Sequence, residues 1–313
     1  MAWLVIAAAL MVLGIIAAML FLFPSLQLVN RHTVMAAAFI PYGMPAFAGA
    51  ALLLATCPTR WLRPVAVVAV AGLVLQVAWT RPYWPATAPQ TSGTAMTLMT
   101  MNMRCDSRGL DDLASLTERV TPDVAVLQGM YAVRGETLSR AWQQILPHKS
   151  FHPMPDLPEC GTLVFSRTPI RVLSGAGEVQ PVVEVSGPNG PLVLLPVDLP
   201  TPSKGVGPWL DGFEHLTAAI TAHQGRALVA AGDFNAVREH APLRDLLADT
   251  GLRDAAAVAG SGWAPTFPAG AWYPPLIGLD HVLISPGLGA AHVRTEAIGG
   301  QQHRALTALV GRT

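Results

Sequence analysis

The sequence predicts a mixed α/β domain of two packed sheets with helices outside, preceded by three membrane-spanning helices. The chain of 313 residues is 51% hydrophobic but only 13% charged, whereas soluble globular proteins carry about 25% charged residues. Residues 1–95 contain four Arg and no Lys, Asp or Glu, while residues 96–313 contain short apolar runs bounded by Gly and Pro. We therefore divide the chain into a membrane anchor (1–81), a Pro-rich linker (82–95) and a second domain (96–313).

Three uncharged apolar runs make up the predicted anchor, at residues 3–23, 34–57 and 64–80. A bilayer core about 30 Å thick requires about 20 apolar residues per helix, which each run approaches or reaches. A signal peptide would begin with basic residues and have a shorter apolar core, and the first run has neither feature. The second run contains Pro41, Gly43 and Pro45, so a kinked or re-entrant segment is the alternative to a straight span. We expect a multi-pass protein of the cell membrane, with the lipid bilayer as its first partner.

The arginines set the expected orientation. Arg60 and Arg63 lie in the short loop between the second and third runs, whereas the first loop holds only Arg31. Cytoplasmic loops carry an excess of Lys and Arg, which places the loop after the second run inside the cell. The N-terminus is then cytoplasmic and the C-terminal domain extracytoplasmic.

The charges of the second domain exclude one class of partner. The chain has 20 basic and 20 acidic residues, and four of the basic ones lie before residue 96, so residues 96–313 hold 16 basic and 20 acidic residues. Proteins that bind nucleic-acid backbones need clustered Lys and Arg, so we expect no nucleic-acid partner. Cys105 and Cys160 could form a disulfide outside the cell, although the sequence does not supply the Cα spacing that decides it.

Strand and helix patterns are mixed in the second domain. Helical spacing of apolar residues appears at 109–120, 208–223 and 241–250. The runs at 179–186 and 191–197 flank Gly-Pro-Asn-Gly and predict a hairpin, and the run at 169–173 continues the strand before it. Other strands are expected at 96–103, 123–128, 161–166, 227–231, 279–284, 292–297 and 305–310.

Polar side chains lie at the ends of several of these strands. Asn102 follows the first strand, and Asp233 and Asn235 follow a buried strand in a tight turn. Asp280 begins a late strand, and His303 directly precedes the last one. Because sites are built on loops at the ends of core strands, we expect these side chains to meet in one pocket.

These segments, in this order, resemble the endonuclease/exonuclease/phosphatase superfamily over nearly all of residues 96–313. The three leading apolar runs resemble its membrane-anchored branch, typified by the teicoplanin-resistance protein VanJ. The Gly-Asp-Phe-Asn run after an apolar strand and the later Leu-Asp-His-Val-Leu run are the most specific signals. The matching segments are TLMTMNMR (97–104), PDVAVLQG (122–129), GTLVFSRTPI (161–170), AAGDFNAVREHAPLRDLL (230–247), APTFP (264–268), GLDHVLISPGL (278–288) and QQHRALTAL (301–309).

The resemblance implies a four-layer α/β sandwich and a phosphohydrolase that uses Mg²⁺ or Mn²⁺. It implies that Asn102 holds a phosphate oxygen or water near the metal and that Asn235 contacts the phosphate. Asp233 would orient or deprotonate the attacking water. Asp280 would hold His303 in one tautomer, and His303 would stabilise charge on the transferred phosphoryl group.

Three positions depart from the family pattern. The family's metal-binding Glu is Gly129, the Asp before its last His is Gln302, and the His at the end of another strand is Asp198. Glycine offers no side-chain oxygen, and an amide is a weaker ligand for Mg²⁺ than a carboxylate. Asn102, Asp233 and Gln302 remain as a weak candidate metal set, with Asp198 on the phosphate side. Either the metal has moved toward Asp198 and Asp233, or none is bound.

Two functional hypotheses follow. The first is a membrane-tethered hydrolase of phosphoesters or pyrophosphates, whose partner at the membrane surface could be a prenyl-phosphate lipid, because tethering raises the local concentration. The alternative is a catalytically inactive family member that binds a ligand or acts as a scaffold subunit in a membrane protein complex. An aromatic, Pro-rich stretch at Trp263, Phe267, Trp272 and Tyr273 is expected beside the mouth of the site, where packing is favoured over lipid binding.

Overall fold

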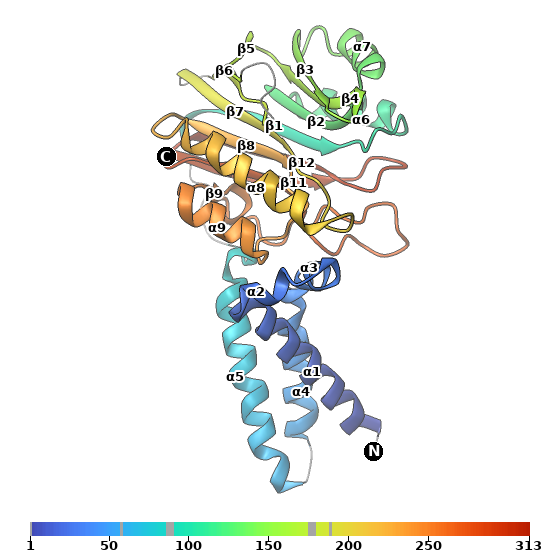
Figure 1. The fold of residues 1–313 in the computed structure, drawn as a ribbon, viewed down its shortest axis with the longest axis vertical. Coiled ribbons are helices and arrows are strands. Elements are labelled where there is room, and N and C mark those ends of the chain that lie inside the picture. Colours follow the sequence, from blue (N-terminus) through green and yellow to red (C-terminus); the bar gives the residue numbers. More distant parts are fainter. Residues whose placement is uncertain (1, 57–58, 86–90, 175–179, 188–189) are drawn as a thin grey trace.

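The computed structural model describes residues 2–56, 59–85, 91–174, 180–187 and 190–313. The molecule is elongated, with a helical unit (residues 2–56 and 59–85) at one end and the α/β domain at the other (Figure 1). The N-terminus lies at the end of the helical unit that is far from the domain.

Three helices pack together in the helical unit: α1 (Ala2–Leu22), α4 (Gly43–Ala55) and α5 (Arg63–Thr80). Short segments connect them near the domain: α2 (Pro24–Gln27), α3 (Arg31–Ala37) and the 3₁₀ turn η1 (Ile40–Tyr42). Two further 3₁₀ turns, η2 (Arg60–Leu62) and η3 (Arg81–Tyr83), flank α5. At about 1.5 Å per residue, α1 is long enough to cross a bilayer core.

The prediction of three spans is met in part. Two helices of the described chain are long and apolar enough to cross a membrane, Ala2–Leu22 and Arg63–Tyr83. The second apolar run is broken into Arg31–Ala37 and Ile40–Ala55, which meet at an angle of 53°. Pro41 lies at this break, and its missing N–H and bulky ring interrupt a helix. The run is thus a bent span or a re-entrant segment rather than a straight helix.

The short connecting segments are seated on the α/β domain. Gln27 is fully buried and its amide donates to the carbonyl of Glu239 at 3.1 Å. The His240 Nε2–H donates to the carbonyl of Val34 at 2.9 Å. These buried polar contacts tie α2 and α3 to the loop before α9 (Ala241–Thr250), and thereby fix the domain against the helical unit.

The domain contains two six-stranded sheets in the described residues. The first has the order β11-β12-β1-β2-β4-β3, and the second has the order β5-β6-β7-β8-β10-β9. Strands of the first sheet are β1 (Ser92–Asn102), β2 (Val124–Tyr131), β3 (His148–Met154), β4 (Leu157–Ser166), β11 (Leu288–Glu296) and β12 (Ala305–Arg312). Strands of the second are β5 (Ile170–Val172), β6 (Val183–Gly187), β7 (Gly190–Asp198), β8 (Leu228–Asp233), β9 (Arg253–Asp254) and β10 (Asp280–Ile284).

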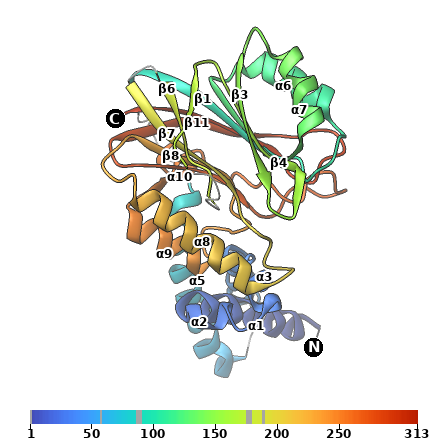
Figure 2. The ribbon, with the colours of Figure 1, turned by 45° about the horizontal axis from the view of Figure 1, so that its top comes forward.

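The four-layer sandwich is confirmed. Helices α6 (Leu110–Val120) and α7 (Ala132–Ala141) pack on the outer face of the first sheet, and α8 (Val206–Thr221) and α9 pack on the outer face of the second (Figure 2). A short α10 (Ala255–Val258) follows β9. The largest apolar cluster lies between the sheets and receives side chains from both.

One sequence expectation changes and another is confirmed. The run at 169–173 does not continue the strand before it, because β5 pairs with β6 in the second sheet. The predicted hairpin is confirmed by antiparallel pairing of β6 with β7 up to Gly187 and Gly190, whereas residues 188–189 at its tip lie outside the described residues. Residues 86–90 of the predicted linker also lie outside them.

Candidate active site

The alternation of the strands brings three polar side chains to one place. Leu98 of β1 and Ala231 of β8 face the core between the sheets. Side chains in a strand alternate between faces, so residues two or four positions further on point into the same gap. Asn102 and Asp233 therefore lie at the end of the inter-sheet core, and the same parity applies to Asp280 at the start of the antiparallel β10.

Three carboxylates lie in register across the second sheet. Asp198 on β7 is paired with Asp233 on β8, and Asp233 is paired with Asp280 on β10. Paired residues on neighbouring strands present their side chains on the same face, with Cβ atoms about 5 Å apart. The sheet thus presents a row of three acidic groups, which needs positive charge nearby to be stable.

Asp233 is held by amides from two directions. The Asn102 amide donates to Asp233 Oδ2 at 2.8 Å, and the backbone N–H of Asn235 donates to Asp233 Oδ1 at 2.7 Å. The Asn235 side chain also donates to Asp233 Oδ2 at 3.2 Å and to the carbonyl of Leu199 at 2.8 Å. Asp233 is buried, and burial raises its pKa although the nearby positive charge of His303 opposes the shift. A carboxylate with this environment is a stronger base than an exposed one.

His303 lies between two of the carboxylates. Its Nδ1–H donates to Asp280 Oδ2 at 2.9 Å, and its Nε2 lies 3.9 Å from Asp233 Oδ2. Burial lowers the pKa of His303, but the charges of Asp280 and Asp233 outweigh burial and raise it to about 9. The ring is therefore a cation at neutral pH, with its Nε2–H directed to the side away from Asp280.

Two of the three altered positions also border this site, and the third does not face it. The backbone of Gly129 borders Asp198 and lowers the pKa of its carboxyl group. Burial and the charge of Asp233 raise the pKa of Asp198 to about 8, and its Oδ2 is buried with no hydrogen-bond partner among the described residues. The Gln302 side chain is exposed, and its neighbour Gln301 is the buried one, donating to the carbonyl of Arg108 at 2.7 Å.

The remaining donors fit a hard divalent cation with a changed ligand set. The carboxylate oxygens of Asp233 and Asp280 lie within 4.8 Å of each other, next to His303, whose protonated ring has no lone pair for a metal ion. In addition, Asp280 Oδ1 and Asp198 Oδ2 are buried oxygens with no partner in the described part of the chain. Carboxylate oxygens are the ligands that Mg²⁺ and Mn²⁺ prefer. Gly129 supplies no ligand and the Gln302 side chain is exposed to solvent. An ion would therefore be held by the row of Asp198, Asp233 and Asp280.

The comparisons with known proteins identify the family. The family model described as "Endonuclease/Exonuclease/phosphatase family" matches residues 99–301, about two thirds of the chain. The chain belongs to this family. Proteins of the family are related to phosphatases and nucleases and generally use a divalent metal. No curated protein matches the chain.

Solved structures of the endonuclease/exonuclease/phosphatase family share the fold. One from Beutenbergia cavernae is 18% identical, with a TM-score of 0.54, covering 70% of this chain and 72% of that one. A sphingomyelinase C from Streptomyces griseocarneus is 17% identical, with a TM-score of 0.50 and coverage of 69% and 99%. The Neisseria 3′ phosphatase NExo, bound to a product DNA hairpin, is 20% identical, with a TM-score of 0.51 and coverage of 68% and 98%. These similarities show the fold. The activity of this chain has to be argued from the residues of its own site.

Sequence reasoning left one feature beside the site open and missed another. A disulfide joins Cys105 to Cys160, a pairing that the sequence left open, with a Cα–Cα distance of 6.0 Å. The residue before it, Arg104, is exposed, and its positive charge acts on His303. The sequence signal for Arg104 was its place in the run Asn-Met-Arg-Cys (102–105), because an Arg two residues after Asn102 lies at the end of the same strand.

One residue of the aromatic stretch, Phe267, lies beside the site. The Phe267 ring is 5.1 Å from the His303 ring. Phe267 packs against a small apolar cluster that includes Ile277, Leu279 and Ala38, and Ala38 belongs to the helical unit. The surroundings of the central histidine thus extend through this cluster to the helical unit. Trp263 instead packs against Tyr42 and Tyr83.

Proposed function

We propose that this protein is a membrane-tethered hydrolase of phosphoesters or pyrophosphates, acting on a lipid-linked phosphate at the membrane surface. The position of His303 carries the proposal. Its ring is bound to Asp280, faces Asp233, and lies at the common end of both sheets. A buried imidazolium and a buried carboxylate next to each other are the groups that transfer of a phosphoryl group to water requires.

Each residue has a defined task in this reaction. Asp233 accepts a proton from the attacking water or orients it, while Asn102 and Asn235 hold its carboxylate. The His303 Nε2–H donates to a phosphoryl oxygen and neutralises charge that grows in the transition state. A divalent ion, Mg²⁺ or Mn²⁺, would be held by Asp233 with Asp280 or Asp198, and when bound it would add charge stabilisation at the phosphoryl group.

The contact between the site and the helical unit supports a substrate in the bilayer. The loop that carries Phe267 is also bound to the helical unit through Tyr42, whose hydroxyl donates to the carbonyl of Leu276 at 2.7 Å. Trp272 lies in the sequence between Phe267 and Leu276, and its side chain is 96% exposed. Trp and Tyr favour the interface between lipid and water. We infer that this loop rests on the membrane surface and that the substrate is a prenyl phosphate or pyrophosphate, with nucleic acid disfavoured by the acidic excess of the domain.

The disulfide supports an extracytoplasmic domain. Disulfides form and persist outside the reducing cytosol. The Cys105–Cys160 bond lies in the α/β domain. The excess of Arg in the loop at 58–63 favours the cytoplasmic side for the end of the helical unit that is far from the domain, which leaves the domain on the other side of the membrane. A membrane-impermeant thiol label, applied to intact cells after mild reduction, tests this sidedness. Labelling of Cys105 or Cys160 that requires cell lysis would place the domain in the cytoplasm.

The test of function uses the full chain in lipid nanodiscs. Prenyl pyrophosphate, prenyl phosphate and a phosphodiester are offered with Mg²⁺ or Mn²⁺, and phosphate release is measured. We expect turnover of a prenyl substrate by the native chain and a loss of at least about 100-fold in His303→Ala and Asp233→Asn. His215→Ala, which changes an exposed histidine of α8, is the matched control and should retain full activity.

Two outcomes would contradict the proposal. Absence of turnover on every substrate and metal would favour the inactive, ligand-binding relative instead. Equal activity of the native chain and His303→Ala would mean that the turnover comes from elsewhere.

A further inference from the structure

The loop after β1 has an unusual backbone. Arg104 and Cys105 have φ angles of 55° and 51°, in the left-handed region that residues other than glycine rarely adopt. The loop is held there by two hydrogen bonds. The Arg104 N–H donates to Asn102 Oδ1 at 2.8 Å, and the Cys105 N–H donates to the carbonyl of Gly129 at 2.6 Å. Both partners border the site, because Asn102 binds Asp233 and the backbone of Gly129 lies beside Asp198.

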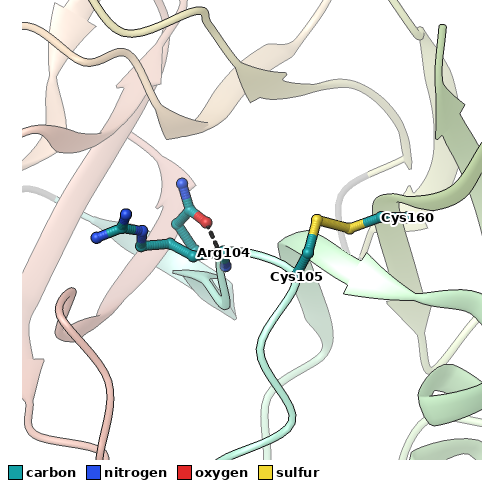
Figure 3. The surroundings of a disulfide bond; sticks show 4 residues. Arg104, Cys105 and Cys160 are labelled. Atoms are coloured by element: carbon teal, nitrogen blue, oxygen red, sulfur yellow. Dashed lines mark hydrogen bonds between the residues drawn. A yellow bond between two sulfur atoms is a disulfide. The ribbon is translucent and has the colours of Figure 1, made fainter. Parts of the chain in front are cut away.

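The disulfide fastens the same loop to the first sheet. Cys105 is bonded to Cys160, which lies in β4 and is paired with Tyr131 of β2. The side chains of Arg104 and Cys105 point to opposite sides of the loop (Figure 3). The covalent bond thus holds one side of the loop while the guanidinium on the other side is free to face a ligand.

The loop fills the space of a side chain at residue 129. A Cβ atom on Gly129 would lie 2.6 Å from the Arg104 nitrogen and 2.8 Å from its Cα, which real Cβ atoms do not tolerate. Gly129 itself has a φ of 56°. The position where the family resemblance places a metal-binding Glu is therefore filled by the backbone that presents Arg104.

The charges of the site call for a further cation when phosphate binds. The carboxyl groups of Asp233 and Asp280 face the ligand position, and His303 is the cation already described. The Arg104 side chain is exposed, and its guanidinium forms no hydrogen bond or ion pair with any residue that the structure describes. Its charge nevertheless reaches His303. Guanidinium groups bind phosphate through two parallel hydrogen bonds, which is stronger and more directional than binding by a lysine.

We propose that Arg104 binds the phosphoryl group of the substrate and that the Cys105–Cys160 disulfide positions it for this task. The proposal rests on the proposed function for the identity of the ligand, but binding of phosphate can be measured without turnover. The ligand is a phosphate monoester or pyrophosphate dianion, bound between the guanidinium of Arg104 and the imidazolium of His303.

The first experiment measures phosphate affinity by calorimetry on the full chain in detergent, with inorganic phosphate and a short-chain prenyl monophosphate as ligands. Arg104→Gln is expected to weaken both ligands at least 10-fold, and Arg104→Lys is expected to weaken them less. Arg108→Gln is the matched control, because Arg108 lies four residues away, is exposed, and pairs with Asp106 at 2.5 Å. Equal phosphate affinity in the native chain and Arg104→Gln would overturn the proposal.

The second experiment tests the role of the disulfide. Cys105→Ser with Cys160→Ser, or reduction of the native chain, should weaken phosphate binding several-fold while the melting curve still shows a folded domain. In the Arg104→Gln background the same change should cause no further loss, because the disulfide acts through Arg104. Additive losses would mean that the bond acts on the fold as a whole and would overturn the positioning role. Phosphate binding that depends on Arg104 without any hydrolysis would sink the proposed function and leave this inference standing.

Discussion

Asn102 and Asp233 are joined by a hydrogen bond of 2.8 Å that crosses the gap between the two sheets. Asn102 ends β1 of the first sheet and Asp233 ends β8 of the second. Both side chains are buried, so the bond aligns the acidic row with the loop of Arg104. The contact makes one site out of residues that are 131 positions apart in the chain.

Replacing Asn102 with Ala should therefore impair activity more than stability. The change leaves one oxygen of Asp233 with fewer donors, which costs about 1–3 kcal/mol of unfolding free energy. We expect kcat for the prenyl substrate to fall by about 10- to 100-fold, because the carboxylate is no longer fixed in place. Steady-state kinetics and urea unfolding measure the two effects. An unchanged kcat with normal stability would show that the bond has no catalytic importance.

The pair formed by Asp280 and His303 makes a prediction about pH. The pKa of His303 is raised to about 9, so the ring stays charged until the pH approaches that value. Its contribution to stability is complete below about pH 6.5, the ordinary histidine pKa, and is lost as the pH rises through about 9. Activity that uses the imidazolium should fall as the pH passes about 9. In Asp280→Asn the fall should move to lower pH, and kcat should drop by about 100-fold or more.

A second buried pair provides the control for this measurement. Asp254 and His281 are also joined at 2.9 Å, but they lie on the other face of the second sheet from the acidic row. Asp254→Asn should lower the melting temperature and leave the pH dependence of kcat as in the native chain. A shift of the pH profile in Asp254→Asn as large as that in Asp280→Asn would remove the special role of His303.

Gly129 should tolerate no side chain. Gly129→Ala places a Cβ against the Arg104 backbone and forces a φ of 56° on a residue with a Cβ, so we expect a loss of about 2–4 kcal/mol. Gly225→Ala separates the cost of the left-handed backbone from the cost of the clash with Arg104. Gly225 has a φ of 82° and no neighbour within 4 Å of an added Cβ. It should lose only about 1 kcal/mol. Comparable unfolding free energies for the two variants would mean that the Arg104 loop moves aside readily.

Replacing Trp272 should reduce activity on lipid substrates and leave activity on soluble substrates unchanged. Because the side chain is 96% exposed, Trp272→Ala should leave the melting temperature unchanged. We expect kcat/KM for a prenyl phosphate in nanodiscs to fall several-fold, with no change for a soluble phosphate ester. Val133→Ala, which removes an apolar side chain that is 71% exposed on α7, should alter neither. Quenching of Trp272 fluorescence by lipid-borne quenchers reports the contact directly, and absence of quenching would contradict it.

Local patterns predicted the strands that carry the site. The alternating run at 96–103 and the apolar run at 227–231 predict strands that end beside Asn102 and Asp233. The register of Asp198, Asp233 and Asp280 was beyond reach, because pairing between distant strands is decided by the whole core rather than by local sequence. Gln302 was predicted as a ligand, yet the turn before β12 buries Gln301 and leaves Gln302 exposed.

The features that the sequence did not reveal all depend on tertiary geometry. The left-handed backbone of Arg104 and Cys105 exists because the disulfide and Gly129 hold it, and neither residue type favours that conformation alone. The pairing of Cys105 with Cys160 required a Cα distance that only the fold supplies. The bend in the second apolar run follows from Pro41, but whether the chain crosses or re-enters there depends on its packing against α1 and α5.

The most direct measurement is a crystal structure of the full chain with tungstate, a heavy-atom mimic of phosphate, located by its anomalous signal. The predicted result is a tungstate at the common end of the sheets, in contact with the Nε2 of His303 and the guanidinium of Arg104, and within reach of Asn102. A tungstate bound elsewhere, with this position empty at saturating concentration, would contradict a phosphate site built from both sheets.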